Sequence, residues 1–162
     1  MYVGRRTFLK SSGGVTLYAL VTDALVTAAG WLDAEEALAQ AWNKAAFDTH
    51  SLGDTLHALG GGEPTQSKDI EFVQTPEIAE NGAVVPVGVT SRIPKTESIA
   101  ILIEKNPNML AAVFDIPTGT EPVISTRVKM AQTSNIYALV KAEGRYYVAA
   151  KEVKVTLGGC GG

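Results

Sequence analysis

The stretch NIYALVKAEGRYYVAAKEVKVTL, residues 135–157, decides the fold class because two long runs in it alternate in polarity. The first run is Asn135–Lys141 and the second is Tyr146–Leu157. Alternation with a period of two is typical of a β-strand with one buried face. The intervening Ala142–Arg145, AEGR, has the composition of a tight turn, so the stretch predicts a β-hairpin.

Five upstream runs share this character, since they are rich in Val and Ile and bounded by Pro, Gly, Asn or Asp. They are Ile70–Gln74, Ala83–Thr90, Ser98–Glu104, Leu110–Ile116 and Val123–Met130. Seven strands at this spacing predict an all-β fold, a two-sheet antiparallel β-sandwich, with a half-open barrel as the alternative. The wholly apolar Ile99–Ile103 is expected to form a central, covered strand. Pro86 lacks an N–H, so its strand is expected at an edge or with a bulge.

The chain before these strands has a helical period. Gln40–Phe47 places its apolar residues on one helical face, and Ser51–Leu59 does the same before the glycines at 60–62. The expected organisation is therefore a helical N-terminal segment over residues 40–62 and a β-sandwich domain over residues 63–157.

The first 39 residues resemble a twin-arginine export signal. Arg5 and Arg6 precede Thr-Phe-Leu-Lys, and the apolar stretch Val15–Leu32 is interrupted by Asp23, which makes it too polar for a stable membrane span. Ala37–Ala39 is an A-x-A cleavage site. The sequence thus predicts a periplasmic protein with a removed signal over residues 1–39 and no membrane segment in its mature form.

Composition excludes several function classes. The chain has 162 residues, 46% of them apolar, which is enough for one hydrophobic core. Its formal net charge of −3 provides no basic surface for binding nucleic acid or an anionic membrane. The two histidines, His50 and His57, lack a third ligand, so no metal site is expected. No nucleotide loop is present, and Met109 and Met130 are expected to pack in the core.

The single cysteine, Cys160, lies in the terminal sequence GGCGG at residues 158–162. A lone cysteine cannot form a disulfide within the chain, so it is a buried thiol, an intermolecular disulfide or a reactive attachment point. Glycines provide no apolar wall and resist ordering, which disfavours burial. Cys160 is three residues beyond Leu157, a reach of about 10 Å. The expected arm consists of Gly158, Gly159, Gly161 and Gly162 around the thiol.

Nothing near Cys160 in the sequence would activate its thiol. A thiol enzyme needs a base or a second cysteine nearby, and the chain has no Cys-x-x-Cys and no histidine beside the arm. The sequence therefore predicts a thiol that is activated by the protein that receives it.

Four segments of the chain carry a family resemblance: IAENGA at Ile78–Ala83, EKNPN at Glu104–Asn108, RVKMAQTS at Arg127–Ser134 and VKVTLGGCGG at Val153–Gly162. Together they closely resemble the SoxY family, the sulfur-carrying subunits of the Sox thiosulfate-oxidation system. The resemblance covers essentially the whole chain after the signal and includes the signal itself.

The resemblance implies an immunoglobulin-like sandwich that pairs with SoxZ and holds sulfur intermediates on Cys160. It implies that SoxAX joins thiosulfate to this cysteine oxidatively, that SoxB hydrolyses the adduct to release sulfate, and that SoxCD in many systems oxidises the remaining sulfur. The chain would be a substrate of these enzymes, not an enzyme, and would need no cofactor beyond the bound sulfur.

Two alternatives stay open from the residues alone. An exported β-sandwich interaction module could use Cys160 for an intermolecular disulfide. Arg127 and Lys129 alternate with apolar residues and share one face, which is either a solvated strand face or a docking surface for an acidic partner.

Overall fold

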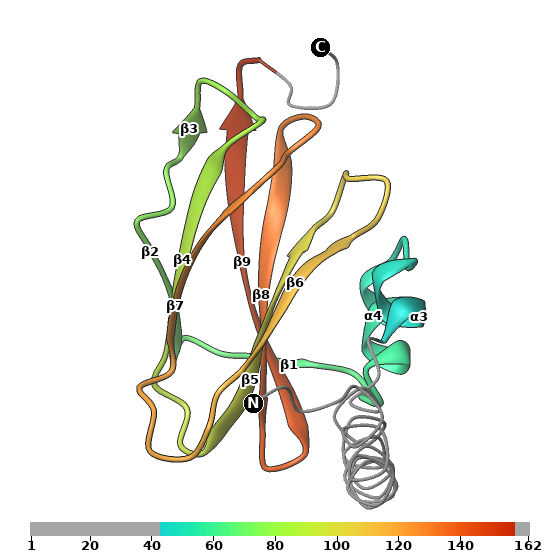
Figure 1. Cartoon of the computed structure of the whole chain (residues 1–162), viewed down its shortest axis with the longest axis vertical. Helices are drawn as coiled ribbons and strands as arrows, with labels where there is room; N and C mark the ends of the chain where they lie inside the picture. The colour runs from blue at the N-terminus through green and yellow to red at the C-terminus, as the bar shows by residue number, and fades with distance from the viewer. Residues whose placement is uncertain (1–42, 158–162) are drawn as a thin grey trace, which may run out of the picture. The chain divides into compact units, whose positions relative to one another are not determined.

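The computed structural model describes residues 43–157, which form a β-sandwich with two short helices against one sheet (Figure 1). The helices are α3 (Lys44–Phe47) and α4 (Leu52–Ala58). The strands are β1 (Thr65–Gln66), β2 (Ile70–Val73), β3 (Ile78–Ala79), β4 (Val85–Ser91), β5 (Thr96–Ile103), β6 (Leu110–Asp115), β7 (Val123–Val128), β8 (Ser134–Ala142) and β9 (Arg145–Val155).

The strands form two sheets. The six-stranded sheet has the order β1-β9-β8-β5-β6, with β3 also paired to β9, and the three-stranded sheet has the order β2-β4-β7. This arrangement confirms the all-β sandwich and rules out the half-open barrel. All seven expected strands are present with ends within two residues of the expected ones. The wholly antiparallel expectation is wrong in one respect, because the two-residue strands β1 and β3 pair with β9 in parallel.

The hairpin of β8 and β9 forms as expected. Its two turn residues, Glu143 and Gly144, have φ values of 49° and 72°. Positive φ at both positions is the type I′ geometry, whose twist matches that of the flanking strands. The turn fixes the pairing of Ala142 with Arg145, and the register continues to Ser134 opposite Val153.

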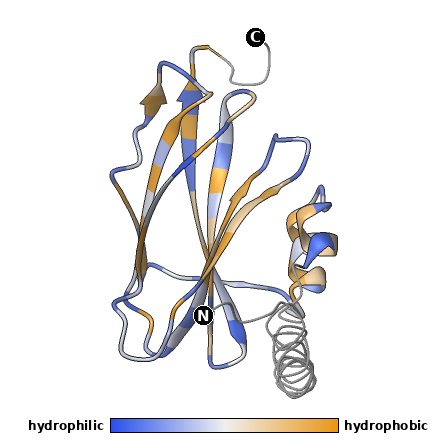
Figure 2. Ribbon diagram, viewed as in Figure 1, coloured by the Kyte–Doolittle hydropathy of each residue, from blue (hydrophilic) through white to orange (hydrophobic). Residues whose placement is uncertain are grey.

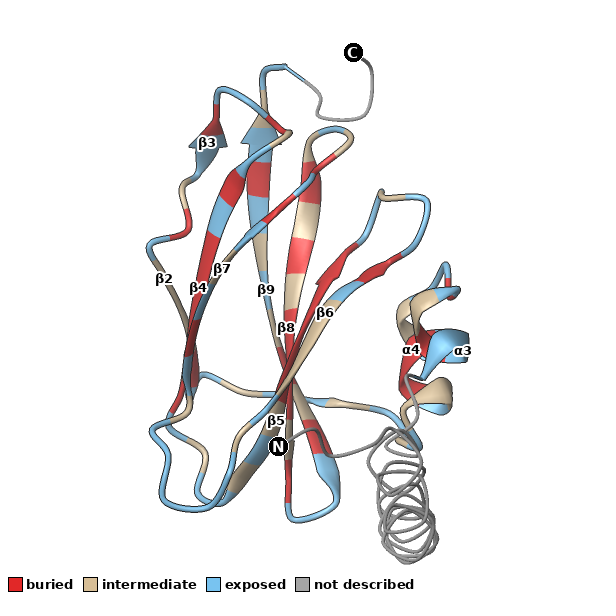
Figure 3. Ribbon diagram, viewed as in Figure 1, coloured by how far each residue is buried: buried red, intermediate tan, exposed pale blue. Residues whose placement is uncertain are grey.

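The main core lies between the sheets. Val85, Val87 and Val89 of β4 are fully buried, whereas Val84 and Pro86 are exposed, so β4 alternates as expected (Figure 3). Other members of this core are Ile70, Ala79, Ile99, Ile101, Ile103, Ile124, Val128, Met130, Ile136, Ala138, Val140 and Val153. Ile99–Ile103 is buried throughout because β5 lies between β8 and β6 and both of its faces are covered.

The expectation for Pro86 needs correction. Its strand, β4, is the centre of the three-stranded sheet rather than an edge, and its pairings run without a bulge. A proline is tolerated because β2 pairs with β4 only between Gly88 and Ser91. Pro86 therefore lies beyond the end of β2 and removes no ladder hydrogen bond on that side.

A second apolar cluster joins the six-stranded sheet to the helices. Hydrophobic segments of both are orange in Figure 2. The cluster joins Leu56 of α4 to Leu102, Leu139 and Tyr146 of the sheet, and Met109 packs in the same cluster. The cluster explains why Leu102 and Leu139 are buried on the side of the sheet that faces away from β4.

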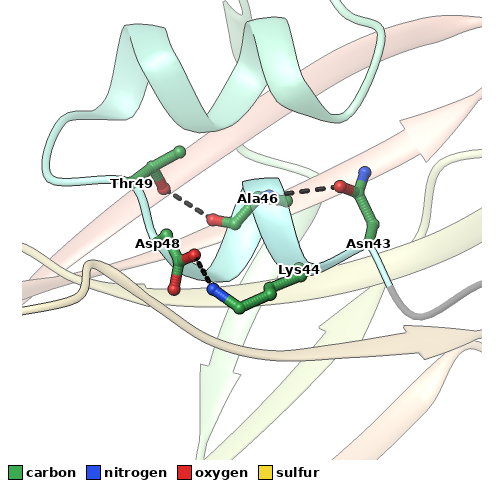
Figure 4. A network of polar contacts seen from close by, with 5 residues as sticks. All are labelled: Asn43, Lys44, Ala46, Asp48 and Thr49. Carbon is green, nitrogen blue, oxygen red and sulfur yellow. Dashed lines mark hydrogen bonds and ion pairs between the residues drawn. The ribbon is translucent and has the colours of Figure 1, made fainter.

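Polar contacts define the short helices. At the start of α3, the side chain of Asn43 accepts a hydrogen bond from the Ala46 N–H, and Lys44 pairs with Asp48 one turn later (Figure 4). Thr49 donates to the Ala46 carbonyl oxygen at 2.6 Å. Helix α4 begins at its N-cap Ser51 and is followed by Gly60, whose φ is 77°. A glycine of positive φ is a common way to end a helix.

Within residues 43–157, no helix is long and apolar enough to cross a bilayer. The expected export signal, with Arg5 and Arg6, lies outside the described residues, as does the beginning of the helical segment at residues 40–42.

Candidate functional site

The expected attachment residue Cys160 and its glycines, Gly158, Gly159, Gly161 and Gly162, lie outside the described residues. The structure describes the residue from which they continue, Leu157, and its contacts within residues 43–157. That residue lies at the end of the sandwich where β3, the β7–β8 connection and the end of β9 lie together (Figure 1).

On one side, β9 extends beyond the point where its pairing with its long neighbour β8 ends. The pairing of the two strands reaches Val153 opposite Ser134, the first residue of β8. Beyond it, Thr133 continues the contact with its side chain, because its hydroxyl oxygen accepts a hydrogen bond from the Val155 N–H at 3.0 Å. The side chain of Val153 is fully buried and that of Val155 packs against the main core. The apolar face of β9 is thus anchored almost to the end of the strand.

On the other side, β3 and the loop after it hold the last two described residues. Thr156 donates its N–H to the Ala79 carbonyl oxygen at 3.1 Å and its hydroxyl to the Glu80 carbonyl oxygen at 3.0 Å. Leu157 accepts a hydrogen bond at its own carbonyl oxygen from the Gly82 N–H, at 2.7 Å. The backbone is therefore bonded up to the residue that precedes Gly158.

Gly82 connects this contact to the β7–β8 connection. While its N–H binds Leu157, its carbonyl oxygen accepts the N–H of Met130 at 2.7 Å. Gly82 is buried, and the Met130 side chain is fully buried in the main core. Asn81 shapes the turn, since its side-chain oxygen accepts the Ala83 N–H at 2.8 Å.

The β5–β6 connection joins the same network through Asn106. Its amide donates to the Lys129 carbonyl oxygen at 2.8 Å, and its oxygen accepts the Ala131 N–H at 3.0 Å. Lys105 adds a bond from its N–H to the Ser134 hydroxyl at 3.1 Å. The four segments that carry the family resemblance are therefore hydrogen-bonded to one another at one end of the molecule.

The surface around this end is mixed in character. Three of the four exposed large hydrophobic residues among those described lie here, Ile78 at 59%, Val84 at 55% and Leu157 at 67% exposure. Nearby on the six-stranded sheet, Glu104 accepts hydrogen bonds from Asn135 at 2.9 Å and from the Tyr137 hydroxyl at 3.3 Å. Burial, and then the Glu104 charge, raises the pKa of Tyr137.

The remaining candidate residues are two histidines and two cations. His50 precedes α4 and its Nδ1 lies within hydrogen-bond distance of the Pro107 carbonyl oxygen, whereas His57 lies within α4, so the two do not share a helix. Within residues 43–157, no three His, Cys, Asp or Glu side chains are grouped to hold a metal. Arg127 and Lys129 are both exposed and alternate with the buried Val128 and Met130.

The sequence predicts the cysteine and the four segments but not the individual residues that hold the end of β9, which are Asn81, Gly82, Asn106 and Thr133. The side-chain oxygens of Asn81, Asn106 and Thr133 are the available signal, because Asn and Thr commonly bind nearby backbone groups.

Comparison with known proteins places the chain in a family. The sequence model described as "Sulfur oxidation protein SoxY" matches residues 56–160, more than half of the chain. Among solved structures, the sulfur carrier protein SoxY from Chlorobium limicola f thiosulfatophilum is 40% identical, with a TM-score of 0.56, and the match covers 64% of this chain and 96% of that one.

A superoxide reductase (neelaredoxin) from Ignicoccus hospitalis is 19% identical with a TM-score of 0.46, and the match covers 53% of this chain and 78% of that one, a likeness too weak to inform function. No curated protein sequence matches the chain. The family match at residues 56–160 and the sandwich shared with a 40% identical carrier protein lead to one conclusion, that the chain belongs to the SoxY family.

Proposed function

We propose that this protein is a periplasmic sulfur carrier that holds thiosulfate-derived intermediates covalently on Cys160. The observation that carries the proposal is the extent of the family match, which runs to residue 160, the cysteine itself. In this proposal Gly158, Gly159, Gly161 and Gly162 form the arm that presents the thiol.

The chemistry requires a thiol that can form and lose a sulfur–sulfur bond. Loading joins the Cys160 sulfur to the terminal sulfur of thiosulfate, giving Cys–S–S–SO₃⁻, one proton and two electrons. Those electrons pass to a c-type cytochrome complex of the SoxAX kind. Hydrolysis by an enzyme of the SoxB kind then cleaves the bond between the sulfane sulfur and the sulfonate, with water supplying the sulfate oxygen, and leaves a persulfide on Cys160. Cysteine is the side chain suited to such exchange.

The geometry at the end of β9 supports this use. Leu157 is bonded to the body of the protein through Gly82, so Cys160 can extend about 10 Å from a fixed point. A charged sulfonate adduct is stable in water and costly in an apolar pocket, which favours a thiol carried outside the core. Glycines keep the arm narrow enough to enter a channel in another protein.

Partners follow from the same proposal. The carrier forms a heterodimer with a SoxZ subunit and visits SoxAX, SoxB and, where present, SoxCD in turn. It supplies no catalytic group, because activation of the thiol and of water belongs to the enzymes that receive the arm. A covalently held intermediate does not diffuse away between these visits.

Export through the twin-arginine pathway is part of the proposal. Replacing Arg5 and Arg6 by Lys should retain the protein and its SoxZ partner in the cytoplasm, as cell fractionation can measure. A partner that still reaches the periplasm would show that it is not carried across with this chain.

Intact-mass measurement tests the function directly. Protein purified from cells grown on thiosulfate should carry a reductant-sensitive mass increment on its C-terminal peptide, matching a thiosulfonate or persulfide. Cys160→Ser should remove the increment, while an alanine at the exposed Ser125 should leave it in place. A disulfide-linked dimer as the sole native form on non-reducing gels would contradict the carrier and favour the interaction module.

A further inference from the structure

We propose that the loop at residues 79–84 and the side chain of Thr133 form a clamp on β9, which sets Leu157 as the pivot of the arm. The clamp consists of Asn81, Gly82, Thr133 and Thr156 with the backbone groups that they bind. This inference rests on the proposed function, since it concerns how the body of the carrier directs Cys160.

The clamp acts where the pairing of β9 with its long neighbour β8 has ended. Pairing with β8 ends at Val153, so Lys154 to Leu157 depend on other contacts. Those contacts come from two sides, the Thr133 hydroxyl on the β8 side and β3 with its following loop on the other. The chain is thus held for four residues past the end of the hairpin ladder.

Gly82 is the centre of the clamp because both of its backbone groups are used. Its N–H binds the Leu157 carbonyl oxygen and its carbonyl oxygen binds the Met130 N–H, each at 2.7 Å. Met130 is fully buried, so the end of β9 is connected through Gly82 to the main core. Asn81 keeps this glycine in position, since its side-chain oxygen holds the Ala83 N–H.

The position of the pivot determines how far the thiol can travel. With Leu157 held, Cys160 lies three residues along the chain from the pivot, an extended reach of about 10 Å. If the clamp opens and Val153 becomes the pivot, Cys160 lies seven residues along the chain from it and the reach rises to about 24 Å. The effective concentration of a group on a flexible chain falls as about the −3/2 power of chain length. Moving the pivot from Leu157 to Val153 would therefore lower the effective concentration of the Cys160 thiol at a receiving site by about 3.5-fold.

A distance measurement tests the clamp without any partner enzyme. A nitroxide on Cys160 and a second one at Ser125→Cys, an exposed position of β7, report the spread of arm positions by pulsed electron spin resonance. The release variant combines Gly82→Pro, which removes the N–H that binds the Leu157 carbonyl oxygen, with Asn81→Ala, Thr133→Val and Thr156→Val. Its matched control combines Asn81→Asp, Thr133→Ser and Thr156→Ser, which keep an oxygen at each position.

The release variant should broaden the distance distribution by up to about 1.5-fold, the value reached when Val153 becomes the pivot, because the r.m.s. length of a flexible chain grows as the square root of the residue number. The control should reproduce the wild-type distribution. Equal distributions in all three proteins would overturn the clamp. Circular dichroism confirms that each protein is folded.

A second measurement needs no variant. In the wild-type protein, amide hydrogen exchange at Gly82, Val155 and Thr156 should be slowed well below the rate of an unstructured peptide. Exchange at unstructured rates would overturn the clamp even if the release variant failed to fold. Absence of sulfur on Cys160 in cells would refute the carrier function but would leave both of these results standing, so the two failures are distinguishable.

Discussion

Deleting Gly158 and Gly159 should strongly reduce enzyme-catalysed loading of thiosulfate onto Cys160, while the thiol stays accessible to small reagents. The deletion places Cys160 directly after Leu157, whose carbonyl oxygen is bonded to the Gly82 N–H at 2.7 Å. The reach of the thiol from this fixed point falls from about 10 Å to about 3.5 Å. A thiol so close to the sandwich surface cannot enter a channel in another protein.

The expected magnitude is large. Because a misplacement of about 1 Å can cost about 100-fold in rate, a shortening of several ångströms should lower enzyme-catalysed loading by at least about 100-fold. The assay measures thiosulfate-dependent mass gain on Cys160 with the cognate cytochrome complex, alongside alkylation by iodoacetamide. Alkylation should stay near the wild-type rate, since the shortened thiol is still exposed to small molecules.

A length-matched variant serves as the control. Replacing both glycines with alanines preserves the distance from Leu157 to Cys160 and should preserve most of the loading rate. Wild-type loading in the deletion variant would refute the reasoning, because it would mean that the receiving site needs no extended arm or that Leu157 is not the point from which the arm extends.

Three other predictions concern the body of the protein. Gly88→Ala should lower the free energy of unfolding by about 1–3 kcal/mol in urea titrations, because the new Cβ would lie 2.4 Å from the Val73 carbonyl oxygen. Leu102→Ala should cost about 2–5 kcal/mol in the same assay, since this fully buried side chain joins the six-stranded sheet to the helices. A hydrogen bond from Lys95, and then its charge, lowers the pKa of Glu143, so the pair stabilises the fold at neutral pH and this contribution disappears as the pH falls through that lowered pKa. Titration by NMR should show the Glu143 pKa rising toward its ordinary value in Lys95→Gln.

The sandwich could be predicted because its signals are local. Alternation with a period of two fixes which face of each strand is buried, and Gly144 readily adopts one of the two positive φ values that a two-residue hairpin needs. The continuous apolar run Ile99–Ile103 similarly identified a strand covered on both faces. Each of these features is contained within fewer than a dozen consecutive residues.

Features that depend on distant chain segments could not be predicted. The strands β1 and β3 have two residues each, too few to show any period, and they exist only because the edge of β9 is available for parallel pairing. The place of β4 between β2 and β7 was also hidden, since Pro86 argues for an edge until the end point of β2 is known. Strand order is a property of the sheet as a whole and not of a single strand.

The candidate site shows the same difference between local features and features that depend on distant segments. A cysteine among glycines is visible in the sequence. The hydrogen bond between Gly82 and Leu157 is not, because it joins two backbone groups that every non-proline residue possesses, and no residue type predicts it. The segments that resemble the family are separated by up to some 75 positions in the chain, and only folding brings them together at the end of β9. Their common feature is the support of one strand end. Residues remote from the cysteine in sequence would therefore determine where its arm begins, and substitutions in the loop at residues 79–84 should alter delivery of the thiol without altering its chemistry.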